Sequence, residues 1–115
     1  LDEKQKLLTL QLALKIADVG HSSTSFSQHL EWSQRLQDEF FAQGDEEKAQ
    51  GLQVSPLMNR DKPGVMDASN QMYFADVIVI PMLEAWQDVG PIGGGMLMQQ
   101  AQFNRAEWAK KKSAR

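Results

Sequence analysis

The 115-residue sequence contains no cysteine, and this absence excludes several kinds of site. Without cysteine there is no disulfide framework, no thiolate zinc site and no cysteine nucleophile. A metal site in this chain must therefore use oxygen or imidazole ligands. The motifs HExxH and GxSxG are also missing, so short motifs indicate neither a metalloprotease nor a serine hydrolase.

The sequence also lacks an excess of basic charge and a long apolar run. Its 12 Lys and Arg against 15 Asp and Glu give a net charge of −3, which argues against nucleic-acid binding because phosphate recognition needs a clustered basic face. No apolar run approaches the ~20 residues of a membrane span, and no signal peptide opens the chain. The composition predicts one soluble, cytoplasmic globular unit without a membrane span.

Helical periodicity dominates the first half of the chain. Apolar residues spaced three and four apart predict a helix over residues 2–19 that is buried on more than one side, with Gly20 as its stop. A second helix is predicted to run to residue 43, with Gly44 as its C-terminal glycine. Residues 45–50 are expected to form a separate short helical turn, followed by an ordered loop with two prolines.

The second half contains two ambiguous segments. VIVIPML, residues 77–83, is rich in β-branched residues, but the spacing of Phe74, Ile78, Met82 and Trp86 favours a helix that carries Pro81 as a kink. GPIGGG, residues 90–95, is predicted to be a flexible connection, since no strand precedes it and no Lys-Ser/Thr pair follows. A last helix is expected over residues 95–112. The prediction is an all-α fold, a compact bundle of four main helices.

Asp18 and His21 are the first candidate site residues. Asp18 follows an apolar run, so its carboxylate emerges where a buried helix ends, a position that can offer a hard oxygen ligand to a cation. His21, three residues later, can share a face with it and orient a ligand or water. Spacing alone favours plainer roles, namely a local cap or salt bridge for Asp18 and a surface loop for His21. His29 is assigned no role.

Gln71 and three apolar residues form a second candidate set. A glutamine amide both donates and accepts hydrogen bonds, so Gln71 can recognise the edge of a heterocyclic base. Phe74, one turn later, offers a flat surface for stacking, and Leu36 and Phe40 on another helix are candidates for the opposite wall. Periodicity alone favours core packing for these three apolar residues.

Four segments together resemble a known enzyme family. They are KIADVGHSS, EWSQRLQDEFFAQGDEEKAQGLQVSPLMNRDKPGVM, QMYFADVIVIPMLEAW and FNRAEW, in this order and spacing. They resemble the C-terminal half of the class I cyclic nucleotide phosphodiesterase catalytic domain over roughly residues 5–110. The resemblance implies that residues 1–115 are the C-terminal subdomain of a larger all-helical catalytic domain.

The resemblance implies hydrolysis of cyclic AMP or cyclic GMP to the 5′-monophosphate, with zinc and magnesium as the two metal ions. By position, Asp18 matches a metal ligand, Gln71 the glutamine that binds the purine, and Phe74 and Leu36 the two walls that clamp the base. Phe40 is expected in the same pocket, and His21 at a variable position that faces the base or ribose. Tyr73 stands where the family usually has glycine.

The other metal ligands and the general-acid histidine of the family are expected upstream of residue 1. The 115 residues are therefore predicted to contain no catalytic residue of their own, to be inactive alone, and to need the N-terminal half of the domain as a partner. An alternative is a non-catalytic helical packing or docking module in a larger assembly. Preference for cyclic AMP or cyclic GMP stays open, because the Gln71 amide can present either its oxygen or its nitrogen.

Overall fold

The computed structural model describes residues 1–114, which form helices joined by short turns and one long loop. The elements in chain order are α1 (Glu3–Asp18), the 3₁₀ turn η1 (Gly20–Ser23), α2 (Phe26–Ala49), α3 (Ala68–Phe74), the π-helical segment η2 (Ala75–Val79), α4 (Ile80–Gln87) and α5 (Pro91–Ser113). No strand occurs within this range. The all-α prediction is confirmed, with α3, η2 and α4 forming one continuous helix.

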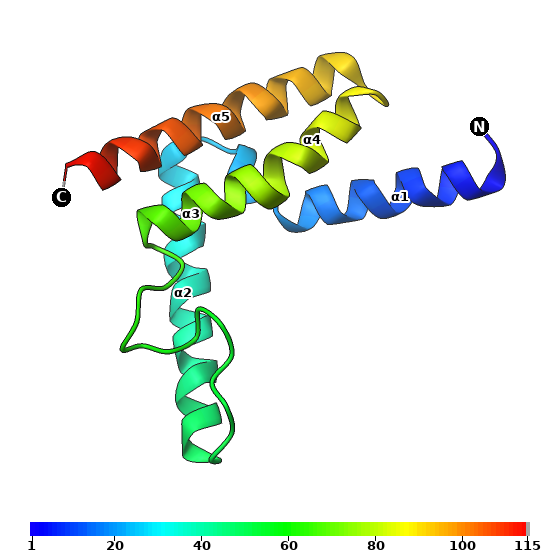
Figure 1. The fold of residues 1–115 in the computed structure, drawn as a ribbon. Helices are drawn as coiled ribbons and strands as arrows, with labels where there is room; N and C mark the ends of the chain where they lie inside the picture. The colour runs from blue at the N-terminus through cyan, green and yellow to red at the C-terminus, as the bar shows by residue number, and fades with distance from the viewer. Residues whose placement is uncertain (115) are drawn as a thin grey trace.

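The helices are spread over principal extents of 49 × 37 × 20 Å (Figure 1). The continuous helix α3–η2–α4 packs along α5, and the C-terminal end of α1 meets α4. The helix α2 crosses below them and projects away, and the loop of residues 50–67 runs back along it toward α3. The turn η1 brings the end of α1, the start of α2 and the middle of α5 together, which creates the corner where the site lies.

Polar caps explain where three of the helices begin. Asp2 accepts a hydrogen bond from the N–H of Gln5 and starts α1, and Ser25 does the same for α2. Asp67 caps α3 by accepting from the N–H of Asn70. Each side-chain oxygen satisfies one of the amide groups that a first helical turn leaves unpaired.

The predicted end of α2 at residue 43 is wrong, and so is the separate turn over residues 45–50. The helix continues through Gly44 to Ala49. It ends in a Schellman motif, in which Gly51 has φ +70° and Leu52 N–H donates to the Glu47 carbonyl. Gly44 is buried inside the helix because a Cβ there would overlap the Met58 carbonyl oxygen of the returning loop. Tertiary packing, rather than helix termination, requires this glycine.

The predicted flexible connection over residues 90–95 is also wrong, because α5 already begins at Pro91. Proline suits the first helical position, where its missing N–H is not needed and its φ is already helical. Gly94 is buried, and a Cβ on it would lie 3.0 Å from Gln87 Cα. Gly94 therefore lets the start of α5 pack closely on the end of α4.

Residues 77–83 are helical, as predicted, and the structure shows how Pro81 is accommodated. Ala75–Val79 form a π-helical segment directly before the proline, which lies in the first turn of α4. A proline ring clashes with the carbonyl four residues earlier and leaves it without a donor, and a π turn changes that register. The helix therefore continues past Pro81 instead of ending.

A small core joins α4 and α5. Its buried members are Val79, Leu83, Met98 and Ala101, and Ile16, Val19 and Phe74 pack against them. The prediction that α1 is buried on more than one side is wrong. Within residues 1–114, α1 has no buried residue and exposes an apolar face. That face consists of Leu7, Leu8, Leu10 and Leu14.

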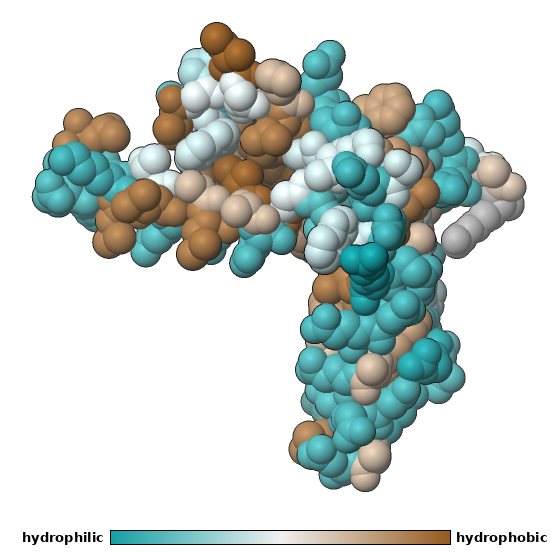
Figure 2. Space-filling model, turned by 180° about the vertical axis from the view of Figure 1, so that it is seen from behind, coloured by the Kyte–Doolittle hydropathy of each residue, from teal (hydrophilic) through white to brown (hydrophobic). Residues whose placement is uncertain are grey.

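Figure 2 shows this apolar surface along the arm formed by α1 and over the adjoining ends of α4 and α5, whereas α2 is mostly hydrophilic. Within residues 1–114, no helix combines the length and apolar character that crossing a membrane requires.

Candidate functional site

A cavity of about 210 Å³ lies at the corner where α1, α2 and α3 meet. Its lining comes from five segments of the chain. The lining residues are Asp18, Val19, His21, Leu36, Phe40, Leu57, Val65, Asn70, Gln71 and Phe74. All six residues singled out from the sequence are among them, so the fold gathers the candidate ligands, the glutamine and the apolar walls into one place.

Asp18 is the last residue of α1, and its exposed side chain reaches the rim of this cavity. Within residues 1–114 its carboxylate makes no hydrogen bond and no ion pair with another residue, so the local cap or salt bridge expected from spacing does not form. A negative charge at a helix C-terminus also opposes the helix dipole, at a cost of about 0.3–1 kcal/mol. The position of Asp18 is therefore not explained by helix stability.

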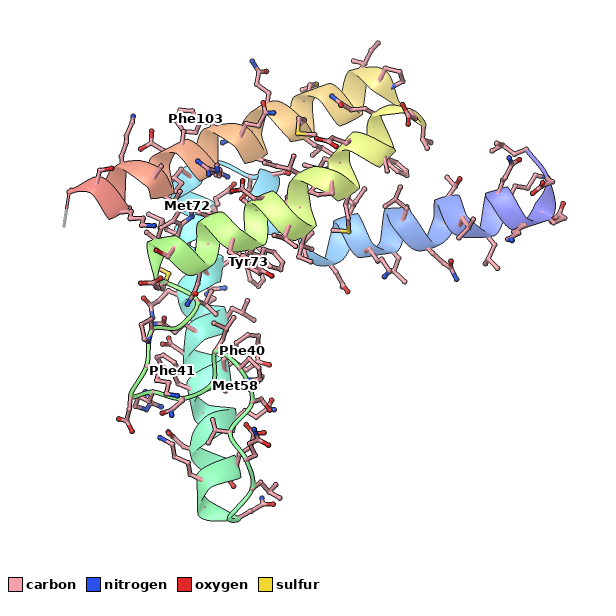
Figure 3. The ribbon with its side chains drawn as sticks, in the orientation of Figure 1. Phe40, Phe41, Met58, Met72, Tyr73 and Phe103 are labelled. Atoms are coloured by element: carbon pink, nitrogen blue, oxygen red, sulfur yellow. The ribbon has the colours of Figure 1, made fainter. Side chains whose placement is uncertain are left out.

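Leu36 and Phe40 lie one turn apart on α2 and face the cavity together with Phe74 of α3. Figure 3 shows Phe40 on the side of α2 that faces the corner toward α1, and Phe41 on the opposite side. Phe74 also packs on the core cluster of α4 and α5, so its ring is held from behind. Core packing and cavity lining thus coincide at this residue, and the two readings of the sequence are both satisfied.

Gln71 is only 7% exposed, and its orientation is set by the backbone. Its Nε2 donates a 2.9 Å hydrogen bond to the Val65 carbonyl, which closes the loop onto the first turn of α3. The amide nitrogen is thereby partly committed, and the Gln71 side chain also forms a hydrogen bond with His29. A ligand in the cavity would meet the amide edge of Gln71 between Asn70 and Phe74, which line the cavity beside it.

A pair of stacked histidines lies beside Gln71. His29 is 2% exposed, and its ring is 5.2 Å from that of His21, centroid to centroid. Trp108 Nε1 of α5 donates to His29 Nε2 at 2.9 Å, while His29 Nδ1 is 3.1 Å from both the carbonyl oxygen and Nδ1 of His21. Because Nε2 accepts, a neutral His29 carries its proton on Nδ1 and donates toward His21.

Burial lowers the pKa of His29 to about 4, with a further lowering from His21, while hydrogen bonds that the His29 ring donates to the His21 carbonyl and to the Gln71 side chain oppose the shift. Burial also lowers the pKa of His21. A charged ring at either position would lack the solvation that water gives it, and charging both rings would place two cations in contact. At neutral pH the pair is therefore uncharged, with His29 buried and His21 in the wall of the cavity.

We expect acid to destabilise the fold through His29. Its unfolded pKa is about 6.5 and its folded pKa is lower, so protons bind preferentially to the unfolded state as the pH falls from about 6.5 to about 4. The loss of stability over this window should reach about 3 kcal/mol. Thermal midpoints between pH 7.5 and 4.5 measure it. His29→Gln keeps an acceptor for Trp108 and should flatten the slope, and an equal slope in that variant would contradict this assignment.

His29 and Leu57 were not among the site residues predicted from the sequence. His29 lies three residues after Phe26 on the inner face of α2, a helical spacing that signals burial. Its partner Trp108 is 79 residues away, so spacing within α2 does not reveal the hydrogen bond. Leu57 lies in the loop before α3, where no periodicity exists to place it in a cavity wall.

Tyr73, in contrast, is 67% exposed and does not line the cavity. Figure 3 shows it in the corner between α3 and α1, where solvent accommodates a large side chain. The same part of the chain has no complete metal site, since residues 1–114 contain no group of three His, Asp or Glu side chains able to hold an ion. Asp18 therefore belongs to no such group within residues 1–114.

The family model for 3′5′-cyclic nucleotide phosphodiesterase matches residues 1–100. The chain therefore belongs to the 3′5′-cyclic nucleotide phosphodiesterase family, and the resemblance found in the sequence is confirmed. The match includes α1, α2, α3 and α4, and thus every residue that lines the cavity.

Two relatives and one solved structure illustrate the similarity. The 3′,5′-cyclic-AMP phosphodiesterase 4 of Dictyostelium discoideum is 34% identical over 74% of this chain, and 8% of its own length is covered. The dual specificity calcium/calmodulin-dependent 3′,5′-cyclic nucleotide phosphodiesterase 1B of Bos taurus is 38% identical over 77% of this chain and is covered over 16% of its length. The chain thus spans less than a fifth of these relatives.

The solved structure of LmjPDEB1 in complex with IBMX matches 99% of this chain with a TM-score of 0.87, at 23% identity. The match covers 34% of that solved chain. At this identity the likeness concerns the fold, and it shows that the open arrangement of α1 to α5 recurs as one part of a larger structure.

Proposed function

We propose that this chain forms the base-binding part of a catalytic domain that hydrolyses cyclic AMP, cyclic GMP or both to the 5′-monophosphate. The observation that carries the proposal is that Gln71, Phe74 and Leu36 line a single cavity whose rim holds the unpartnered carboxylate of Asp18. An amide edge next to an apolar cleft suits a purine, and a carboxylate at the rim suits the metal-bound phosphate end of the same ligand.

Each side chain has a role in this proposal. The base would lie between Phe74 and Leu36, with Phe40 closing the cleft and the Gln71 amide bonding the base edge. His21, partly buried at the cavity wall, would face the base or ribose. Asp18 would supply one ligand to a pair of divalent ions, zinc and magnesium. When bound, such ions neutralise the phosphate and acidify water.

The remaining metal ligands and the general-acid histidine would come from the N-terminal half of the domain, which lies outside these residues. The exposed leucine face of α1 supports contact with that half, because an apolar surface of this kind is normally covered. The chain alone would then hydrolyse nothing, and the full-length protein would act on cyclic nucleotides in the cytoplasm, as a signalling enzyme.

The same leucine face also favours the second candidate, a helical docking module that no longer uses its pocket. Turnover by the full-length protein separates the two. The enzyme should convert cyclic AMP or cyclic GMP to the 5′-monophosphate and lose activity on chelation with EDTA. A correctly folded full-length protein that converts neither nucleotide would favour the docking module.

Phe74→Leu in the full-length protein is expected to raise KM about tenfold, since base stacking on an aromatic ring is worth about 1–3 kcal/mol. Leucine keeps most of the volume that packs on the core, so the thermal midpoint should change little. Tyr73→Leu is the matched control at the exposed neighbouring position and should leave KM unchanged. Equal KM values for Phe74→Leu and the unsubstituted protein would refute stacking on Phe74.

A further inference from the structure

Leu57 adopts a backbone conformation that leucine normally avoids. Its φ is +68°, the only positive φ at a non-glycine residue among those that the structure describes. Met58 N–H donates to the Ser55 carbonyl at 3.1 Å, so residues 55–58 form a turn with Pro56 as its second residue. Proline followed by a positive φ is the signature of a type II turn, whose third position usually holds glycine.

Two features of α2 hold this turn in place. Glu47 accepts hydrogen bonds from Ser55 at both the backbone N–H, at 3.2 Å, and the hydroxyl, at 2.7 Å. One turn of α2 earlier, Gly44 has no side chain, which lets the Met58 carbonyl approach the helix. The turn is thus fixed to α2 at its first and last residues, and such surroundings can keep a strained conformation populated.

Leu57 lines two cavities. It lines the 210 Å³ cavity of the proposed base site and also a second cavity of about 150 Å³, which lies within the loop and is lined by Val54, Asn59, Lys62 and neighbouring residues. A glycine at position 57 would close the same turn without strain. It would also remove a side chain from the lining of both cavities. The strained backbone is therefore needed only because position 57 carries a leucine side chain.

We propose that Glu47 is a positioning residue, which holds the 55–58 turn in its strained form so that Leu57 stands as a wall of the base site. This inference rests on the proposed function, because the wall matters only if a base occupies the cavity. Glu47 itself does not line the cavity and acts through Ser55 and Leu57.

Leu57→Gly and Leu57→Ala in the full-length protein distinguish the effect of losing the side chain from the effect of relieving the positive φ. Both variants lose the side chain, so both should raise KM for the cyclic nucleotide about fivefold with kcat changed less than about twofold. Glycine relieves the positive φ and alanine does not, so the thermal midpoint of Leu57→Gly should lie about 2 °C above that of Leu57→Ala. An unchanged KM in Leu57→Gly would overturn the proposal.

Glu47→Ala tests the hydrogen bonds that hold the 55–58 turn on α2. It should raise KM about threefold in the presence of Leu57 and should add nothing in the Leu57→Gly background, where the wall is already gone. Glu47→Gln keeps an acceptor for Ser55, so its KM should stay close to that of the unsubstituted protein. Glu46→Ala is the matched control, since Glu46 is an exposed acid on the same turn of α2.

Additive effects of Glu47→Ala and Leu57→Gly on KM would overturn the positioning role, as would an equal effect of Glu46→Ala. Absence of turnover in the unsubstituted full-length protein would instead overturn the proposed function and this inference together. Turnover with Phe74-dependent KM but Leu57-independent KM would overturn this inference alone.

Discussion

Asp18→Ala in the full-length protein is expected to lower kcat/KM for cyclic nucleotide about a thousandfold. In the proposed site this carboxylate is a direct ligand of a metal ion, and loss of groups that only support a ligand already costs about 10- to 100-fold. Losing the ligand itself removes charge that holds the cation against the phosphate. The measurement is steady-state hydrolysis of cyclic AMP and cyclic GMP, together with the bound metal content of the purified variant.

The fold should survive this substitution. Asp18 is exposed and makes no hydrogen bond or ion pair with any described residue, and its removal relieves an unfavourable charge at the end of α1. The thermal midpoint should therefore stay within about 2 °C of the unsubstituted protein. Asp88→Ala is the matched control, because Asp88 is an exposed acid at the C-terminal cap of α4. Undiminished turnover in Asp18→Ala would contradict the metal role.

The fold class and the membership of the cavity were predictable from the sequence for different reasons. Helical periodicity identified the helices, including residues 77–83, where spacing outweighed β-branched composition. Spacing did not reveal the site, since it favoured a local cap for Asp18 and core packing for Phe74. Only the family resemblance, carried by the sequences and order of four segments, assigned these residues to one site. The structure brings them to one cavity.

The errors at the end of α2 and the start of α5 share a physical cause, which is that glycine placement depends on contacts between different helices and loops. Gly44 and Gly94 resemble helix breaks when read locally, yet both lie inside helices because another backbone passes too close for a side chain. The reverse holds at Leu57, where a left-handed turn contains no glycine to signal it. His29 was missed because the indole that bonds it comes from α5.

Gly44→Ala is expected to destabilise the helical domain by about 3 kcal/mol or more. Alanine is favoured over glycine in a helix by about 1 kcal/mol, so local propensity alone predicts a gain. Here the added Cβ would overlap a backbone oxygen, that of Met58, and no rotamer change relieves such a contact. Either α2 or the 50–67 loop must shift, and a shift breaks the two hydrogen bonds between Glu47 and Ser55.

Gly93→Ala supplies the opposite result in the same protein. Gly93 lies in the first turns of α5, and a Cβ there would have no neighbour within 4 Å. It should therefore gain about 0.5–1 kcal/mol from helix propensity. Thermal or urea unfolding of both variants measures the pair. A stabilising Gly44→Ala would mean that the loop does not lie on α2, and then neither Leu57 nor Val65 would be held in the wall of the cavity.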